Sequence, residues 1–263
     1  MTTSSNDFNA AADSYDEVFT YSLIGKVQRS RVYYWLKEYH FFKQSKNVFE
    51  VNCGTGYDAE QFHHFGHKVT ATDGSDRMIS IAKKNRAKSI NFYQLAFQDI
   101  AGNNDLKNAD FLFSNFGGLN CLDKNELANF ITSVGALQKK QDQLAWVIMP
   151  KRCFMEDCYL FFKFKWNQIG RRNVVEKVAI NVEGVAVDTF YHSPKEVSKL
   201  LENNYVIQAV KPVAFLLPPS YLEPFFKRYS WLLNGLSLLE RLFGRFRIFA
   251  NWSDHYLIIA ERK

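Results

Sequence analysis

The chain has 263 residues and a net charge of +6, from 33 Lys and Arg against 27 Asp and Glu. This length allows one full α/β core, and the basic residues are too scattered for a nucleic-acid-binding surface. Four cysteines without a CxxC spacing argue against a zinc site, and the chain shows neither a signal peptide nor an apolar run of about 18 residues. We therefore expect a cytoplasmic protein without a bound metal.

The first 150 residues predict a helical cap followed by a parallel sheet. Residues 1–44 are expected to form the N-terminal cap, with a helix from about 24 to 40 that packs through one face. In residues 45–150, apolar runs alternate with helical patterns, which predicts a parallel sheet with right-handed crossovers. The expected strands are 47–52, 67–73, 91–97, 109–116 and 143–149, and the expected helices between them are 57–65, 75–87 and 123–137.

Beyond residue 150 the alternation changes. Residues 174–191 alternate apolar and polar positions around Glu183-Gly184, which predicts a β-hairpin. A helix and two further strands would complete a doubly wound, mostly parallel α/β sheet of seven strands within a single domain, 1–263. We interpret 151–192 and 218–250 as a hairpin and helical lid or as contacts with a second copy. The expected late elements are a helix at 193–202 and strands at 205–217 and 256–260.

A glycine turn follows the first strand, in the stretch from Glu50 to Gly56 (Glu-Val-Asn-Cys-Gly-Thr-Gly). Such a turn brings the backbone close to a ligand and presents N–H groups at a helix N-terminus. Alone it also fits a dinucleotide site, because the sequence continues as G-x-G-x-x-A. Two acids favour another nucleotide. Glu50 lies inside the strand, where a dinucleotide fold needs only apolar packing, and Asp73 ends the next strand, where it would accept both ribose hydroxyls.

The same stretch resembles the E-x-G-x-G-x-G motif of class I S-adenosylmethionine-dependent methyltransferases. The resemblance is close over about 45–150 and implies a Rossmann-like sheet that binds S-adenosyl-L-methionine. Asp73 resembles the family's ribose-binding acid, and Asp99 resembles the residue that meets the adenine amino group. Asn115 and Phe116 match the positions beside the methionine moiety.

Asn52 departs from this pattern, because glycine usually stands there. Asn tolerates left-handed backbone angles, so the turn can survive, and its side chain would narrow the pocket or bond to the methionine portion. Tyr15 and Tyr21 are placed to fold over the cofactor, and Arg31 would bind the methionine carboxylate or be solvated. The cofactor-binding residues implied by the resemblance are Tyr15, Tyr21, Arg31, Glu50, Asn52, Cys53, Gly54, Gly56, Asp73, Gly74, Ser75, Met78, Gln98, Asp99, Ile100, Asn115 and Phe116.

Methyl transfer is an in-line displacement, so the protein mainly aligns the reactants and excludes water. A general base is needed only for a weakly acidic hydroxyl acceptor. His255 and His192 are the candidate catalytic residues, with Glu156 and Asp157 as further candidate bases, although each histidine could equally be structural. Asp254 precedes His255, but neighbours on a strand face opposite sides, so adjacency proves no contact.

The acceptor is expected to be a hydrophobic small molecule, aromatic or polyketide-like. The chain has 24 Phe and 13 Tyr, which suit an aromatic-lined pocket or an apolar lid, although a core would use most of them. It lacks an Asn-Pro-Pro-Tyr-like signature of DNA and amino-group methylation and a dense acidic cluster for magnesium. The amphipathic, basic stretch from Tyr221 to Phe246 would form a lid, a homodimer surface or a peripheral membrane contact. Two alternatives remain, an NAD-dependent oxidoreductase and a catalytically silent cofactor-binding scaffold.

Overall fold

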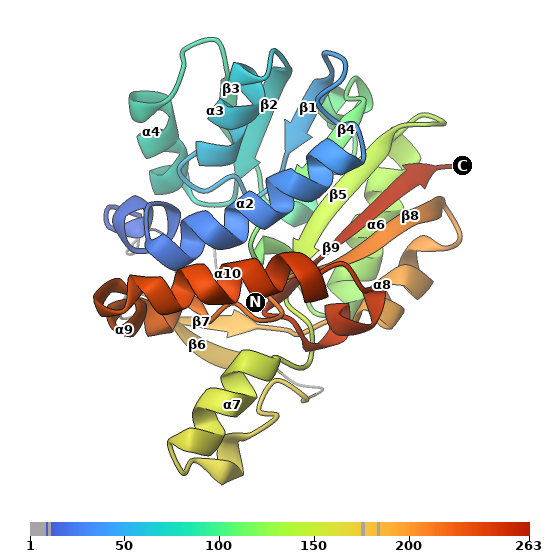
Figure 1. Cartoon of the computed structure of the whole chain (residues 1–263). Helices are drawn as coiled ribbons and strands as arrows, with labels where there is room; N and C mark the ends of the chain where they lie inside the picture. Colours follow the sequence, from blue (N-terminus) through green and yellow to red (C-terminus); the bar gives the residue numbers. More distant parts are fainter. Residues whose placement is uncertain (1–8, 10–11, 175–176, 183–184) are drawn as a thin grey trace.

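The computed structural model describes residues 9, 12–174, 177–182 and 185–263. Seven strands form one sheet in the order β3-β2-β1-β4-β5-β9-β8, and a separate two-stranded sheet pairs β6 with β7 (Figure 1). The strands are β1 (Asn47–Glu50), β2 (Lys68–Asp73), β3 (Asn91–Gln94), β4 (Phe111–Ser114), β5 (Gln143–Ile148), β6 (Val178–Val182), β7 (Val185–Thr189), β8 (Tyr205–Val213) and β9 (His255–Arg262).

Strands β1 to β5 are parallel, and β9 runs antiparallel to both of its neighbours, β5 and β8. This arrangement confirms the predicted mostly parallel, doubly wound sheet of seven strands. The α-helices are α2 (Leu23–Glu38), α3 (Tyr57–His64), α4 (Asp76–Asn85), α5 (Asn104–Lys107), α6 (Lys124–Leu137), α7 (Phe154–Phe162), α8 (Pro194–Leu201), α9 (Glu223–Arg228) and α10 (Ser230–Phe243).

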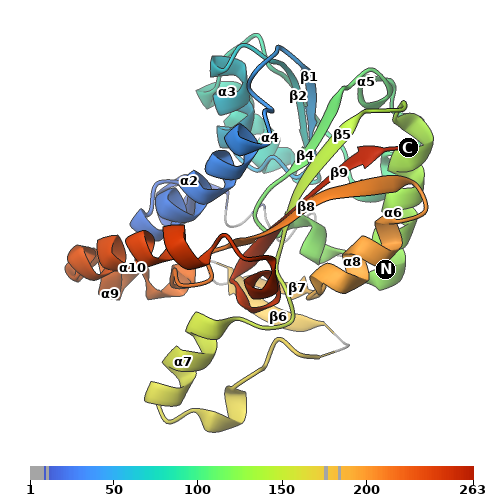
Figure 2. The same ribbon diagram turned by 45° about the vertical axis from the view of Figure 1, so that its right-hand side comes forward.

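Helices cover both faces of the sheet, so its central strands are apolar on both sides. Figure 2 shows α2, α3 and α4 on one face and α6 and α8 on the other. Within β4, Leu112 packs in the cluster that contains α6 and α8, whereas Phe111 and Phe113 pack in the cluster that contains α2 and α3. Because successive residues of a strand face opposite sides, the continuous apolar run of β4 serves both layers.

Four strands, β1, β3, β4 and β8, end at least two residues earlier than the sequence pattern predicts, and three of them are followed by a residue with a left-handed backbone. Asn52, Phe116 and Ala214 have φ angles of 47°, 45° and 66°, in the left-handed region that a strand cannot contain. The apolar runs therefore continue past the last paired residues of β1, β4 and β8. At the first two positions the chain turns away at the carboxyl edge of the sheet, which is where parallel α/β folds place ligands.

The segments after β5 gather at the same edge. The predicted hairpin is present as the antiparallel pair β6 and β7, while Glu183-Gly184 at its turn lie outside the described residues. In both views α7 projects beyond this pair, away from the sheet (Figures 1 and 2). Helices α9 and α10 pack against the start of α2 through a small cluster that includes Ile24, Phe226 and Leu233. Within the described part of the chain, no helix combines the length and the apolar character needed to cross a membrane.

Only part of the expected N-terminal cap can be compared, because residues 1–8 and 10–11 lie outside the described range. Asp16–Thr20 forms a single π-helical turn ahead of α2. The N-terminus of α2 is capped by a side chain that lies far away in the sequence. Glu223 of α9 accepts hydrogen bonds from the backbone N–H groups of Leu23 and Ile24. The cap and the C-terminal segment are therefore coupled through the unsatisfied donors of a helix start.

Candidate cofactor and acceptor site

One cavity of about 410 Å³ lies at the carboxyl edge of the sheet and extends beneath β6 and β7. Its walls come from the N-terminal segment, the ends of β1, β2 and β4, the loop after β5, and the lid segments. The predicted residues that line it are Tyr15, Asn52, Gly54, Asp73, Gly74, Ser75, Met78, Gln98, Ile100, Asn115, Phe116 and His255.

Asp73 fixes the glycine turn to the start of α4. One carboxylate oxygen accepts from the backbone N–H of Gly54 at 2.8 Å and the other from that of Ser75 at 2.9 Å. Burial raises the pKa of the Asp73 carboxyl, while these two hydrogen bonds lower it. Each carboxylate oxygen has a second lone pair, so the group can still accept from two ligand hydroxyls.

The glycines of the turn have different reasons to be glycine. Gly54 has a φ of 54° and faces Tyr15, whose ring lies 3.5 Å from the place a Cβ would take. Gly56 has a φ of 76° at the N-cap of α3, and a Cβ there would lie 2.8 Å from the Phe92 ring. Gly56 therefore shapes the turn from outside the cavity lining. Cys53 lines a small adjoining hollow instead, and burial raises the pKa of its thiol well above the ordinary value.

Asn52 adopts the left-handed conformation that was expected to be tolerable there. Its side chain spans the gap between β1 and β4. The Oδ1 atom accepts from the Ser114 hydroxyl at 2.6 Å, and Nδ2 donates to the carbonyl of Asn115 at 3.0 Å. The Asn52 side chain, which glycine would lack, thus links the ends of two strands by hydrogen bonds. It also narrows the cavity.

A buried polar cluster lies behind Asn52. Asp58, in the first turn of α3, accepts from Arg29 Nε at 3.0 Å and from the Tyr33 hydroxyl at 2.8 Å on one oxygen. Its other oxygen accepts from Asn115 Nδ2 at 2.9 Å. Glu50 is 2% exposed beside this cluster, and its Oε2 makes no hydrogen bond to a described residue. Burial and the nearby Asp58 raise the pKa of Glu50 well above its ordinary value, and Arg29 opposes them.

Two cap residues lie outside the cavity lining. Arg31 packs on α2 with its guanidinium over the rings of Tyr34 and Trp35. Tyr21 is 46% exposed, and its hydroxyl accepts from Arg86. Positions 29 and 31 point to different sides of the helix, because each residue advances about 100° around it. Arg29 is therefore the arginine of α2 that lines the cavity.

The cavity wall near Asp99, where the adenine contact was expected, is formed by the residues on both sides of Asp99. Gln98 and Ile100 contribute to the lining, whereas Asp99 is exposed on a 3₁₀ turn between them. Met78 of α4 forms the neighbouring apolar wall and is buried. The position just after β3 thus faces the cavity, and the assignment of the adenine contact to Asp99 remains a prediction.

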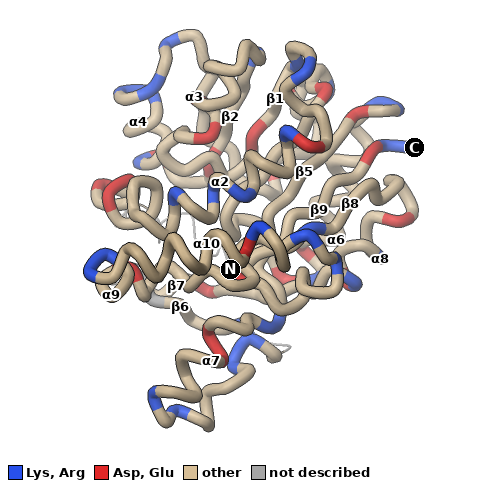
Figure 3. Tube along the Cα trace, in the orientation of Figure 1, with Lys and Arg blue, Asp and Glu red and all other residues tan. Residues whose placement is uncertain are grey.

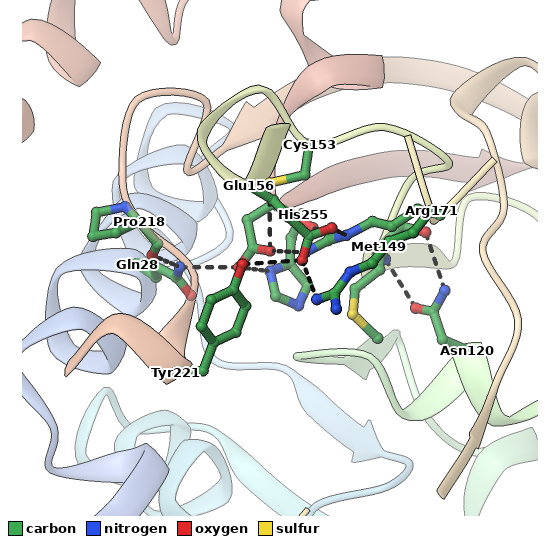
Figure 4. A network of polar contacts seen from close by, with 11 residues as sticks. Gln28, Asn120, Met149, Cys153, Glu156, Arg171, Pro218, Tyr221 and His255 are labelled. Carbon is green, nitrogen blue, oxygen red and sulfur yellow. Dashed lines mark hydrogen bonds and ion pairs between the residues drawn. The ribbon is translucent and has the colours of Figure 1, made fainter. Parts of the chain in front are cut away.

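A second polar cluster lies at the other end of the cavity, between α7, the loop after it and the chain entering β9 (Figure 4). Glu156 of α7 accepts from Arg171 and Tyr221 on one oxygen, at 2.6 and 3.1 Å, and from Arg172 on the other, at 2.9 Å. Arg172 also donates to Asp254 Oδ1 at 2.7 Å. This cluster joins α7 and the segment after it to the chain entering β9, so it fixes these elements relative to one another at this end of the cavity.

His255 faces the cavity from the start of β9. Its ring meets that of Phe116 edge to face at 5.3 Å, and its Nδ1 lies 3.2 Å from Asp254 Oδ2. The same oxygen accepts from Gln28 Nε2 at 3.1 Å. Burial tends to raise the pKa of Asp254, but His255 and Arg172 together hold it below its ordinary value. Sequence neighbours meet here because Asp254 precedes the strand, where no alternation applies.

The other candidate bases have structural contacts. His192 is buried outside the cavity lining, with Nε2 2.9 Å from the carbonyl of Leu122. Burial lowers the pKa of this imidazole. Asp157 accepts from the backbone N–H of Gly170 and stabilises the loop after α7. Of the candidate bases, His255 and Glu156 line the cavity.

Several site residues were missed by the sequence reasoning, namely Gln28, Arg29, Asp58, Arg171 and Arg172. Asp58 had a signal, because it follows Gly-x-Gly by two residues and begins a helix, where an acid is favourable. Gln28 and Arg29 would have needed the rotation of α2 about its axis. The arginine pair is placed by the fold of the lid, which no local pattern contains. Among the described residues, no group of three or more His, Cys, Asp or Glu side chains could hold a metal ion.

Comparison with known proteins identifies the central segment. Residues 48–141 match the family model described as Methyltransferase domain. This segment is a methyltransferase domain. A malonyl-[acyl-carrier protein] O-methyltransferase of Bacillus anthracis is 34% identical over 89 residues, which cover 33% of this chain and 32% of that protein. The matched part thus spans about a third of the curated relative's length.

Solved structures extend the likeness of fold to the whole chain. Magnesium protoporphyrin IX methyltransferase from Synechocystis PCC 6803, solved with bound SAH, has a TM-score of 0.60 at 13% identity, covering 98% of this chain and 97% of that one. The 1,6-didemethyltoxoflavin-N1-methyltransferase of Burkholderia thailandensis has a TM-score of 0.56 at 14% identity, covering 98% and 86%. The methyltransferase domain therefore lies within a chain of the class I methyltransferase fold.

Proposed function

We propose that the protein transfers a methyl group from S-adenosyl-L-methionine to a small molecule that has an apolar body and a protic acceptor group beside His255. The observation that carries this proposal is that one cavity reaches both Asp73 at the glycine turn and His255 at the lid. A cofactor and an acceptor can thus lie end to end in it. S-adenosyl-L-homocysteine would be the product.

The residues at the glycine turn fit this cofactor. Glu50 keeps a buried carboxylate oxygen without a described hydrogen-bond partner, which a positively charged amino group nearby would stabilise. Arg29 is paired with Asp58 but also lines the cavity, and its remaining N–H groups can donate to a carboxylate, so Glu50 and Arg29 suit the two charged groups of an amino acid. Asp73 would accept the ribose hydroxyls, and Gln98 and Ile100 would flank the base.

Tyr15 would cover the cofactor from the N-terminal segment. Its ring packs over Gly54, and it lines the cavity. Burial raises the pKa of Tyr15 to about 12, so its hydroxyl stays neutral at physiological pH. A neutral aromatic ring beside the sulfonium position would stabilise that cation.

When bound, the cofactor supplies an activated methyl group with a good leaving group, so the protein's residues need only align the acceptor and exclude water. His255 would take the acceptor proton. With Nδ1 facing Asp254, the tautomer that keeps its proton on Nδ1 is favoured, and Nε2 is left as the acceptor. Arg172 and Gln28 hold Asp254 in place and act as positioning residues.

The acceptor half of the cavity supports a partly hydrophobic substrate. Leu122, Met149, Ile180 and Val187 line it, together with the rings of Tyr191 and Tyr221. The segments 151–192 and 218–250 would act as its lid, since their contacts through Glu156 enclose it. Arg171 and Arg172 are paired with carboxylates, so they do not by themselves require an anionic substrate.

Calorimetry with S-adenosylmethionine, S-adenosylhomocysteine and NAD tests the cofactor assignment. We expect binding of the first two and none of NAD. Binding of NAD alone would instead indicate an oxidoreductase. Transfer of labelled methyl groups to a panel of phenols, aliphatic alcohols and amines of similar size then tests the activity. If the cofactor binds but no acceptor class is methylated, the silent scaffold becomes the better interpretation.

A further inference from the structure

The last residues of α7 and the turn that follows it present four aromatic side chains to solvent. Phe161, Phe162, Phe164 and Trp166 are 54%, 76%, 80% and 61% exposed, and we call them the aromatic tip. Scattered exposed apolar residues are ordinary, but a contiguous group of large rings marks a contact surface. The tip lies at the far end of α7, the part of the chain that projects from the body (Figures 1 and 2).

The aromatic tip is held in a defined shape. Phe164 has a φ of 58°, which reverses the chain, and the backbone N–H of Lys165 returns to the carbonyl of Leu160 at 2.9 Å. The Trp166 indole donates to the carbonyl of Phe161 at 3.2 Å, and the two rings stack at 6.3 Å. Local hydrogen bonds therefore hold these rings in solvent-exposed positions. The rings do not owe their arrangement to burial against the body of the protein.

The charges around the tip are of one sign. Lys163 and Lys165 alternate with the aromatic residues, and both are exposed. Residues 158–174 contain four Lys and Arg and no Asp or Glu. The acids of α7 are used internally, because Glu156 pairs with Arg171 and Arg172 and Asp157 binds the loop. In Figure 3 the acidic positions of α7 lie at its start and basic positions lie at the turn beyond it.

We propose that the aromatic tip docks on an anionic lipid surface. Aromatic rings favour the boundary between headgroups and acyl chains, and lysines beside them favour anionic headgroups. A second copy of the chain fits less well, because a two-fold contact through the tip would bring Lys163 and Lys165 against their own copies without a facing acid. Charge thus selects the lipid surface over a homodimer at this face.

The docking would place the acceptor half of the cavity next to the lipid phase. Helix α7 carries the tip at its end and Glu156 of the cavity lining on its inner side. If the proposed methyl transfer is correct, an apolar acceptor could enter from the membrane without crossing water. This last step rests on the proposed function, whereas docking itself does not.

Sedimentation of the full chain with phosphatidylcholine vesicles, with and without phosphatidylglycerol, tests the docking. We expect binding to the anionic vesicles that weakens as salt is added. Lys163→Ser with Lys165→Ser should weaken that binding roughly 30-fold. Phe162→Ser, Phe164→Ser and Trp166→Ser together should weaken it by at least about tenfold on either composition. Phe65→Ser, at an exposed aromatic ring at the end of α3, is the matched control and should change nothing.

Calorimetry with S-adenosylmethionine on the triple variant separates the two proposals. Unchanged cofactor affinity with lost vesicle binding would support docking and would show that the variant is folded. Failure of the wild-type chain to bind anionic vesicles would overturn docking, whatever the methyl-transfer result. A concentration-dependent dimer that disappears in the triple variant, without vesicle binding, would assign the tip to a second copy and also overturn the proposal.

Discussion

The side chain of Asn52 lies in the space that a Cβ atom on Gly118 would need. A Cβ built at Gly118 would be 2.5 Å from Cβ of Asn52 and closer still to its amide. Gly118 begins the 3₁₀ turn after β4 and has no left-handed angle of its own, so this neighbour is what excludes a larger residue. The amide and the glycine together close the gap between β1 and β4 beside the cavity.

Gly118→Ala should therefore be strongly destabilising, and a second substitution, Asn52→Gly, should reduce this destabilisation. We expect the free energy of unfolding to fall by about 1–3 kcal/mol in the single alanine variant, because the neighbours are overpacked. In the double variant the loss should be smaller than the sum of the two single losses, by about 0.5–3 kcal/mol. Denaturant titration of all variants measures this coupling.

Gly235→Ala is the control for this pair, because nothing lies within 4 Å of the added Cβ and the site is helical. It should be neutral or slightly stabilising. Additive losses at positions 52 and 118 would contradict the coupling.

Asp73→Ala should weaken cofactor binding by roughly 100-fold, because two hydrogen bonds to a charged acceptor are lost. Calorimetry with S-adenosylhomocysteine measures the change. Part of the loss would come from the glycine turn, since Asp73 also accepts from Gly54 and Ser75. Asp76→Ala, at an exposed acid three residues on, should leave affinity unchanged. Equal affinities of both variants and the wild type would remove the ribose assignment.

The raised pKa of Glu50 predicts that cofactor binding depends on pH. Burial raises this pKa, so the free protein holds a proton on Glu50 above the ordinary range. A cationic ligand nearby lowers the pKa again and expels that proton. Affinity for S-adenosylmethionine should therefore rise with pH until Glu50 is ionised in the free protein, and then level off.

Calorimetry in two buffers with different ionisation enthalpies should detect proton release on binding. Glu50→Gln should abolish both the release and the slope with pH. Glu60→Gln should preserve the proton release and the pH slope, because Glu60 lies on α3 beside Arg86 and lines neither the cavity nor the small adjoining hollow that Glu50 lines. A wild-type protein that releases no proton would rule out this role of Glu50.

His255→Asn should lower kcat by about 10²- to 10⁴-fold if the acceptor is a hydroxyl. Asp254→Asn should give a smaller loss, since it disturbs the orientation of the imidazole. His192→Asn should reduce stability and leave kcat nearly unchanged. A fully active His255→Asn enzyme would mean that no base is required there.

The sequence alone determined the sheet and the cofactor end of the cavity. Strand spacing and apolar period predicted β1 to β5, because parallel strands buried on both faces need continuous apolar runs. The helix expected at 123–137 is observed as α6, and its start is fixed by a capping box between Asp123 and Glu126, a pattern of local sequence. The turn from Glu50 to Gly56 and Asp73 are local signals, since each lies at the end of a strand whose place in the sheet fixes its direction.

Only the tertiary structure decided which residues far apart in the chain meet. Arg29 rather than Arg31 faces the cavity because of the way α2 is rotated about its axis. The sequence does not reveal this rotation, although the two arginines lie only two positions apart. The contacts of Glu156 with Arg172 and Tyr221 join α7 to the loop after it and to the segment before α9, and these contacts depend on how the elements after β5 pack together. Asp254 meets His255 because the chain bends before β9. Local sequence fixes what lies at a strand end, whereas long-range packing fixes what stands opposite it.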